Sequence, residues 1–354
     1  TEGWGDLDLG DENSWDVVIL GDSRDLDPET RNTRRIGNAL AAGDLDGDGI
    51  DDLVIGSTDR NPDTGVHGTL LDPEGSHLPG KAYVMFGRPS WERRYEFTLD
   101  QYDVRFVGAA ERELGEAVAV GRVGSSDARA DLVLGAPSVP GTEVEPVPGP
   151  GRVYVIRGWG FTLPDKTVDL PGELAMFPYV ATIEGATEPF SAVVSYAGGE
   201  VAERRADGFG AAVAVADVDG DGLGDLVVGA PGYAAVTSSD PPEAREGAVY
   251  LFRGRSWFAP PGSALRGTLY ADAQAGGDQD AALLGPPVAS DTGHTGFGSV
   301  VHAGDLTGDG RAEVIVGAPD ALLQMRVGPL DLVRENAGRV YVLEATNDAL
   351  SSGA

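Results

Sequence analysis

Cysteine is absent from this chain, lysine is rare, and no long apolar run occurs. Without cysteine, disulfides, thiolate metal sites and a cysteine nucleophile are excluded. Lys81 and Lys166 are the only lysines, and 26 basic residues face 57 acidic ones, for a formal net charge of -31 over 354 residues. Because such a negative surface repels phosphate backbones, we expect no nucleic-acid partner. No apolar run approaches the ~18 residues that span a bilayer, so we expect no membrane insertion.

Glycine and proline are abundant instead. The 52 glycines and 23 prolines favour many tight turns between short elements, and they argue against long helices. A hydrophobic content of 41% is that of a folded globular protein. The composition therefore predicts short strands joined by turns and loops.

One unit recurs four times along the chain. Each copy has an apolar A run, a turn rich in Gly and Asp, and an apolar B run, followed by a C run with a central tyrosine and a weaker D run. The A runs begin at Ile36, Leu114, Phe209 and Phe297, and the C runs cover 81–87, 152–158, 248–254 and 339–343. Short apolar runs bounded by Gly and Asp are strand signals, so each unit predicts a four-stranded antiparallel sheet.

The repeat predicts an all-β fold, a β-propeller with four blades of four antiparallel strands in one domain over residues 1–354. We place blade 1 at about 36–108, blade 2 at about 114–185, and blade 3 at about 209–271 with its D strand at 267–270. Blade 4 covers about 297–345 and has no D run of its own. We expect the N-terminal strand at 15–21 to complete blade 4 and so to close the ring.

The repeat resembles the FG-GAP repeats of integrin α-subunit β-propellers and their bacterial relatives. Two copies carry the name-giving motifs in full, Phe209-Gly210 with Gly229-Ala230-Pro231 and Phe297-Gly298 with Gly317-Ala318-Pro319. The resemblance covers nearly the whole chain. It implies adhesion or recognition without catalysis, and a secreted or cell-surface location.

Three of the A–B turns predict calcium sites. Asp residues at alternate positions of an Asp-x-Asp-x-Asp-Gly turn converge on one point, and a backbone carbonyl adds another oxygen ligand. An EF-hand would need Glu at the twelfth position, which here holds Ile55, Val228 or Val316. The ligands we predict are Asp44, Asp46, Asp48, the Ile50 carbonyl and Asp52 in loop 1; Asp217, Asp219, Asp221, the Leu223 carbonyl and Asp225 in loop 3; and Asp305, Thr307, Asp309, the Arg311 carbonyl and Glu313 in loop 4.

We expect about three Ca²⁺ ions, and the ion in loop 4 should bind more weakly because that loop has one carboxylate fewer. The second loop has lost the pattern, since Arg122 replaces the first ligand. We therefore predict no calcium in blade 2, and a pair between Arg122 and Asp127 or Asp131. A hard cation held by protein oxygens leaves little open coordination, so we expect a structural role for the calcium.

Strand alternation places the A–B loops on one face and the long B–C and D–A loops on the other. Long loops on a rigid scaffold often bind partners, so we expect a monomer that binds a protein or a neutral glycan through the long-loop face. The candidate contacts are Phe190, Tyr196, Arg204, Arg205 and Tyr233. We find no catalytic motif and expect no enzyme, and we place His302 in the core. A carbohydrate-binding or polysaccharide-active propeller remains the alternative.

Overall fold

The structure is a computed structural model of the chain. It describes residues 16–21, 35–58, 80–108, 113–123, 128–137, 151–160, 166–170, 172–173, 180–185, 190–196, 199–205, 207–236, 244–254, 268–271, 278–288, 295–321, 323–327, 330–334 and 337–344. The fold is all-β, and strands account for nearly all of its regular structure. No helix in these ranges has the length and apolar character that crossing a membrane requires.

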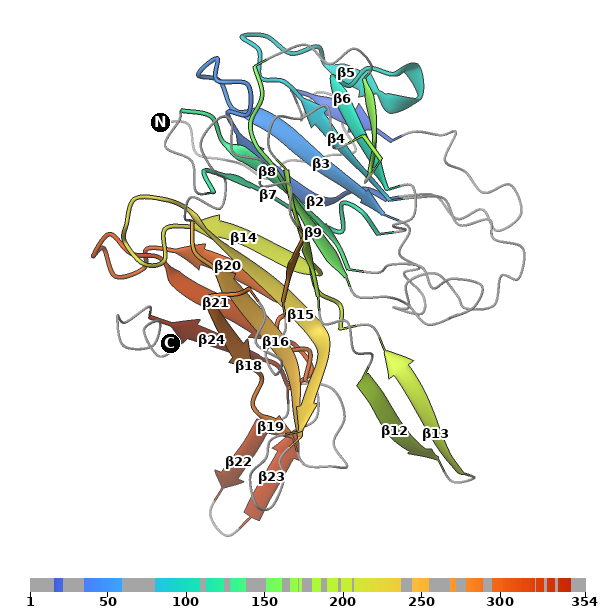
Figure 1. Cartoon of the computed structure of the whole chain (residues 1–354), viewed down its shortest axis with the longest axis vertical. Coiled ribbons are helices and arrows are strands. Elements are labelled where there is room, and N and C mark those ends of the chain that lie inside the picture. The colour runs from blue at the N-terminus through green and yellow to red at the C-terminus, as the bar shows by residue number, and fades with distance from the viewer. Residues whose placement is uncertain are drawn as a thin grey trace.

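Four antiparallel sheets follow one another along the chain, one for each repeat, and we call them blades 1 to 4 (Figure 1). Their strands are named A to D in chain order. Blade 1 contains β2 (Arg35–Gly43), β3 (Asp52–Thr58), β4 (Lys81–Met85) and β6 (Val104–Gly108); blade 2 contains β7 (Ala117–Gly121), β8 (Asp131–Ala136), β9 (Arg152–Ile156) and β11 (Val180–Glu184). Blade 3 contains β14 (Ala212–Ala216), β15 (Asp225–Val236), β16 (Ala244–Phe252) and β18 (Ala281–Leu284), and blade 4 contains β20 (Val300–Gly304), β21 (Glu313–Ala318) and β24 (Arg339–Leu343).

A further strand joins the outer edge of two blades in the parallel direction. It comes from the C–D connection of the following blade: β10 (Thr167–Leu170) pairs with β6, and β17 (Thr268–Tyr270) pairs with β11. The C–D connection of blade 1 contains β5 (Arg94–Glu96) and a 3₁₀ turn, η2 (Phe97–Leu99). Strand β5 pairs in parallel with the N-terminal strand β1 (Val18–Leu20). The C–D connection therefore links neighbouring blades, which the repeat alone did not reveal.

One strand prediction is wrong, and the predicted closure of the ring is not confirmed. The D strand of blade 3 is β18, which pairs with Ala248 to Leu251 of β16, whereas the predicted segment at 267–270 contains β17 and joins blade 2. The N-terminal strand hydrogen-bonds to β5, and among the described residues blade 4 is a sheet of three strands, β20, β21 and β24. Closure of the ring by the N-terminal strand is therefore not confirmed among the described residues.

The remaining strands form or extend hairpins in the long connections. Strands β12 (Phe190–Tyr196) and β13 (Gly199–Arg205) form one hairpin, β22 (Leu323–Val327) and β23 (Leu330–Arg334) form another, and β19 (Pro287–Val288) extends β16. Figure 1 shows both hairpins projecting at the lower right and bottom, while the A–B loops lie on the left. This arrangement agrees with the two faces that strand alternation predicts.

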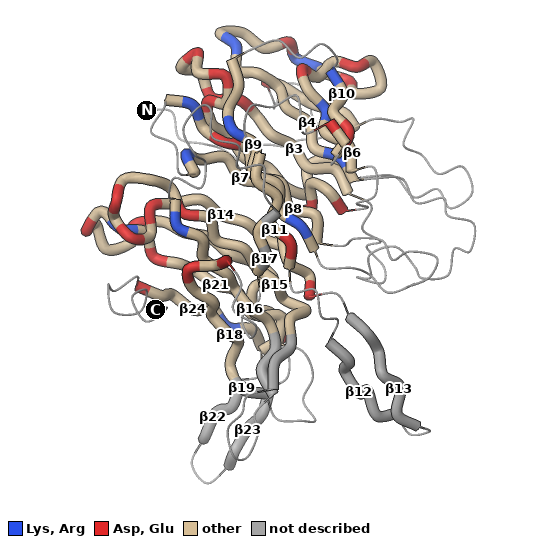
Figure 2. The backbone as a smooth tube through the Cα atoms, viewed as in Figure 1, with Lys and Arg blue, Asp and Glu red and all other residues tan. Residues whose placement is uncertain are grey.

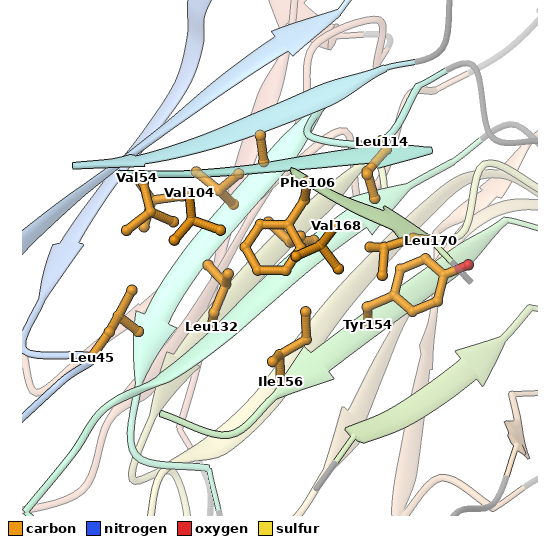
Figure 3. Close-up of a cluster of buried hydrophobic side chains, with 14 of the residues drawn as sticks. Leu45, Val54, Val104, Phe106, Leu114, Leu132, Tyr154, Ile156, Val168 and Leu170 are labelled. Atoms are coloured by element: carbon orange, nitrogen blue, oxygen red, sulfur yellow. The ribbon is translucent and has the colours of Figure 1, made fainter. Parts of the chain in front are cut away.

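The core consists of apolar layers between successive blades. The four A strands β2, β7, β14 and β20 lie side by side in that order, and each interblade layer takes one face from each of two blades. Figure 3 shows the layer between blades 1 and 2, where Val54 and Phe106 of blade 1 meet Leu132 and Tyr154 of blade 2. The repeated C-strand tyrosine thus faces the preceding blade, and Tyr154 is fully buried there. Each blade depends on its neighbours to cover its apolar faces.

Candidate metal centres

The first A–B loop is organised around the side chain of Asp44. Its Oδ1 accepts hydrogen bonds from the backbone N–H of Gly47 at 2.6 Å and Asp48 at 3.1 Å, and its Oδ2 accepts one from Gly49 at 2.9 Å. Gly47 and Gly49 have φ of +84° and +87°, a conformation that costs glycine little. The Asp-x-Asp-Gly-Asp-Gly order therefore gives the tight turn that the sequence predicts.

The third loop repeats this geometry in blade 3. Asp217 accepts from Gly220 at 2.7 Å, Asp221 at 3.1 Å and Gly222 at 2.8 Å. Gly220 and Gly222 have φ of +80° and +88°. Two loops 173 positions apart thus fold alike because they share the same residue types at the same spacing.

Each of these two loops gathers carboxylates at one point. One oxygen from each of Asp44, Asp46 and Asp48 lies within 4.8 Å of the others, and in blade 3 the same holds for Asp217, Asp219 and Asp225. Like charges ~4 Å apart repel by about 4 kcal/mol per pair at an effective dielectric of 20. A donor set made only of oxygens suits a hard cation such as Ca²⁺, which would remove this repulsion. The residues present therefore fit the predicted ion.

The fourth loop holds its first aspartate in the same way but gathers fewer charges. Asp305 accepts hydrogen bonds from Gly308 at 2.6 Å and Gly310 at 3.0 Å, and the bonds from Gly310 and then Gly308 lower the pKa of its carboxyl. Thr307, in place of the second aspartate, donates its hydroxyl to Glu313 at 3.2 Å. No group of three metal-ligating side chains comes together among the described residues of this loop.

The carboxylate at the ninth position of the A–B loop, counted from the first aspartate, has a structural role that sequence reasoning missed. In blade 1 the buried Asp52 accepts from the N–H of Leu45 at 2.8 Å and from the N–H of Gly87 at 2.7 Å, so it ties the A–B loop to the residues after strand C. The same pair of bonds runs from Val123 and Gly158 to Asp131 in blade 2, and from Val218 and Gly254 to Asp225 in blade 3. Because blade 2 keeps these bonds without the calcium pattern, the bonds need no ion.

Blade 2 does not show the predicted ion pair within the described residues. Asp131 accepts its hydrogen bonds from backbone N–H groups, and no ion pair to Arg122 is present in the described part of this loop. The other predicted partner, Asp127, lies outside the described residues. Backbone hydrogen bonds thus satisfy the carboxylate that we had assigned to the arginine.

Arginines from the even blades lie across the acidic loops of the odd blades. The side chain of Arg129 in blade 2 passes so close to Gly47 that a Cβ there would meet its Cγ at 3.0 Å, and Arg311 of blade 4 lies equally close to Gly220. The N–H of Ala130 also donates to the Asp44 carbonyl, and that of Ala312 to the Asp217 carbonyl, both at 2.7 Å. The first ligand of each odd loop is therefore held by the next blade.

Two buried carboxyls make the loops sensitive to pH. Burial, above all, raises the pKa of Asp52 to about 6 and that of Asp225 to about 6, and neighbouring aspartates add to the rise. A carboxyl whose pKa is raised by folding stabilises the protein below its unfolded value of 3.8 and loses that contribution as the pH rises through about 6. We therefore expect the melting temperature in chelator to fall as the pH rises across this window.

In excess calcium the trend should reverse, because the ion requires ionised carboxylates. Melting curves across the same pH window, with chelator and with calcium, check this. The variant with Asp52→Asn and Asp225→Asn should show a weaker pH dependence in chelator than the wild type. Parallel pH profiles in chelator and in calcium would contradict the assignment.

The candidate contacts predicted for the long-loop face fall on two different elements of the structure. Phe190, Tyr196, Arg204 and Arg205 lie on the β12–β13 hairpin, whose side chains are outside the described part of the chain. The structure corrects the prediction that Tyr233 contacts a ligand. Its side chain is 6% exposed and packs edge-on against Tyr250, with ring centroids 6.2 Å apart. Its side chain belongs to the core, because β15 runs on past the Gly-Ala-Pro motif as a strand.

The acidic loops all lie on the side of the blades away from the hairpins. Figure 2 shows acidic segments on the loops along the left of the molecule, where the A–B loops lie. The fold and these loops together define an all-β repeat protein with blades of the propeller type and acidic turns between strands A and B. The carbonyls of Ile50, Leu223 and Arg311 remain predicted ligands.

Comparison with known proteins identifies the repeat. The FG-GAP repeat family matches residues 36–67, 209–252 and 297–343, which lie in blades 1, 3 and 4. Integrin alpha-8 of Gallus gallus is 34% identical over 146 residues, and integrin alpha-3 of Cricetulus griseus is 31% identical over 143 residues. The chain therefore contains FG-GAP repeats in three of its blades and is similar there to integrin alpha chains.

These likenesses are partial in extent. The matched segments are 41% and 40% of this chain but only 11% and 10% of the two integrin chains, so the chain spans about a tenth of those relatives. Among solved structures, the exotype rhamnogalacturonan lyase YesX and the rhamnogalacturonan lyase YesW each have a TM-score of 0.36 and 17% identity. The similarity covers 90% of this chain and 51% and 53% of theirs.

Proposed function

We propose that this chain is a calcium-binding, non-catalytic recognition module of the extracellular space. The observation that carries the proposal is the gathering of three carboxylates at equivalent A–B loops of two FG-GAP blades. Chance clustering of surface acids would not repeat the same turn, the same hydrogen bonds and the same interblade arginine in blades 1 and 3. The repeated geometry supports a site built for one kind of ion.

In this proposal Ca²⁺ is bound by the residues that the sequence indicates in loops 1, 3 and 4. Loop 4 binds its ion more weakly, since Thr307 replaces a carboxylate and its hydroxyl bonds to Glu313. Loop 2 binds none. The ion supplies positive charge where three or four carboxylates converge, and the chain's own residues hold the turn. The role of the ion is structural, because each A–B loop connects strands A and B of its own blade and is hydrogen-bonded to the next blade.

Recognition takes place on the long-loop face in this proposal. The β12–β13 hairpin contains two aromatic and two arginine residues among the candidate contacts, and it projects from the side opposite the acidic loops (Figure 1). Aromatic and arginine side chains are the residues that most often dominate binding energy at interfaces. The net charge of -31 favours a neutral or cationic ligand, either a protein or a neutral glycan.

A glycan array and a panel of extracellular-matrix proteins, probed with and without calcium, test the proposal. We expect binding of one class, lost when residues 190–205 are replaced by a short Gly-Ser turn and kept when the 323–334 hairpin is replaced in the same way. Melting curves serve as the folding control for both replacements. Cleaved glycan products would favour the polysaccharide-active alternative, and binding that survives the loss of 190–205 would contradict the assigned surface.

A further inference from the structure

The two ends of the blade series expose apolar residues that the inner blades bury. Val340 and Val342 of β24 are 70% and 54% exposed, whereas the equivalent residues of blade 3, Val249 and Leu251, are 1% and 4% exposed. These positions face the following blade, and blade 4 has none among the described residues. At the other end Leu40 of β2 is 62% exposed on the face that would meet a preceding blade. His302, which we had placed in the core, is likewise exposed on blade 4.

Glycines mark where one blade touches the next. In three blades a Cβ on the glycine that ends the B-strand motif would lie about 2 Å from a carbonyl oxygen of the next blade, so only glycine fits there. That carbonyl always belongs to the glycine that opens the next A strand. The distance from the added Cβ to this oxygen would be 2.1 Å from Gly56 to Gly115, 2.1 Å from Gly135 to Gly210, and 2.0 Å from Gly229 to Gly298.

The terminal blades contain one half of this contact each. A Cβ on Gly317 of blade 4 would meet only Val300 of its own blade, at 3.3 Å, and Gly37 of blade 1 has no described atom within 4 Å of the Cβ position. Gly317 has no positive φ that would call for glycine. Its glycine is therefore explained by a close approach that the described residues of one copy do not make, and Gly37 has the complementary geometry.

The N-terminal strand points to the same missing neighbour. In blades 1 and 2 the strand that receives a parallel partner from the next C–D connection is the D strand of that blade. Strand β1 receives β5 in this way, so β1 occupies the place of the D strand of a blade before blade 1. Blade 4 is the one blade without a D strand among the described residues, and the outer edge of β24 is open there.

We propose that a second copy of this chain packs the face of its blade 1 on the exposed face of blade 4, with its β1 completing the partner's blade 4 beside β24. The contact continues the interface already present between blades 1 and 2, 2 and 3, and 3 and 4. Because the two faces differ, the contact is head to tail, and two copies close into a ring of eight blades. This assembly differs from the monomer that the sequence led us to expect.

Light scattering after size-exclusion chromatography tests the assembly. The wild type should have twice the 36.7 kDa mass of one copy. Val340→Glu and Leu40→Glu each place a charge on one of the two faces, so each variant alone should have half the wild-type mass. A mixture of the two should regain dimers, because the intact blade 4 of one variant can meet the intact blade 1 of the other. Unchanged circular dichroism and a cooperative melting transition show that both variants fold.

Three outcomes would overturn the proposal. A wild type with the mass of one copy would show that the faces are not joined between copies. Variants that stay dimeric would place the interface elsewhere. A mixture that stays monomeric would exclude the head-to-tail arrangement, because an intact pair of faces would then have failed to associate.

Discussion

Excess chelator should lower the melting temperature by about 10 °C. Calcium that is 1,000-fold above its dissociation constant stabilises the folded state by about 4 kcal/mol for each site. Two such sites, in loops 1 and 3, give about 8 kcal/mol, and at an unfolding entropy of about 2.1 cal/mol/K per residue a chain of 354 residues shifts by about 1.3 °C for each kcal/mol. The effect is large because the loops lie between blades: the N–H groups of Ala130 and Ala312 bind the carbonyls of Asp44 and Asp217 across two interblade junctions.

Scanning calorimetry in calcium, in EDTA and after adding calcium back measures this change. The double variant with Asp46→Asn and Asp219→Asn should melt low in calcium and should no longer respond to chelator. The exposed Asp169→Asn on β10, which removes one carboxylate away from the loops, is the control and should behave as the wild type. A transition that stays unchanged in excess EDTA would remove the structural role of the ion.

The A, B and C strands were predictable because their signals are local. Each is a run of β-branched and apolar residues next to a fixed turn, and the structure places strands at every one of these runs. The edge strands were not predictable, since β17 and β18 have only three and four residues and differ mainly in the strand with which each one pairs. Pairing of so short a strand is decided by the neighbouring blade, which periodicity does not encode. The pairing of β1 with β5 was missed for the same reason.

The turn conformation of the candidate metal loops was predictable, but their contacts with the next blade were not. The Asp-Gly spacing alone accounts for the hydrogen bonds of Asp44 and Asp217. The interblade arginines were missed because they stand in the degenerate or weaker loops, where the pattern looked merely incomplete. An Arg-Ala-Asp or Arg-Ala-Glu sequence before strand B, at Arg129 and Arg311, is the signal that would have found them. Tyr233 was misjudged because a loop was assumed where β15 continues.

Gly229→Ala should destabilise the chain by about 3 kcal/mol or more, at the upper end of the cost of overpacking a core. The added Cβ would lie 2.0 Å from the Gly298 carbonyl oxygen and 3.4 Å from the Cβ of Ala212, so blades 3 and 4 would have to separate. Neither contact is the flexible end of a long side chain, and the backbone cannot swing away. Urea unfolding followed by tryptophan fluorescence measures the loss.

Gly317→Ala is the matched control, since it makes the same change at the same position of the repeat. Here the new Cβ meets only Val300 of the same blade, at 3.3 Å, so the stability of one copy should change by no more than about 1 kcal/mol. If a second copy covers blade 4, the same substitution should halve the mass in solution while the chain stays folded. Equal destabilisation by both substitutions would show that local strand geometry sets the need for glycine, whereas a large difference assigns it to the contact between blades.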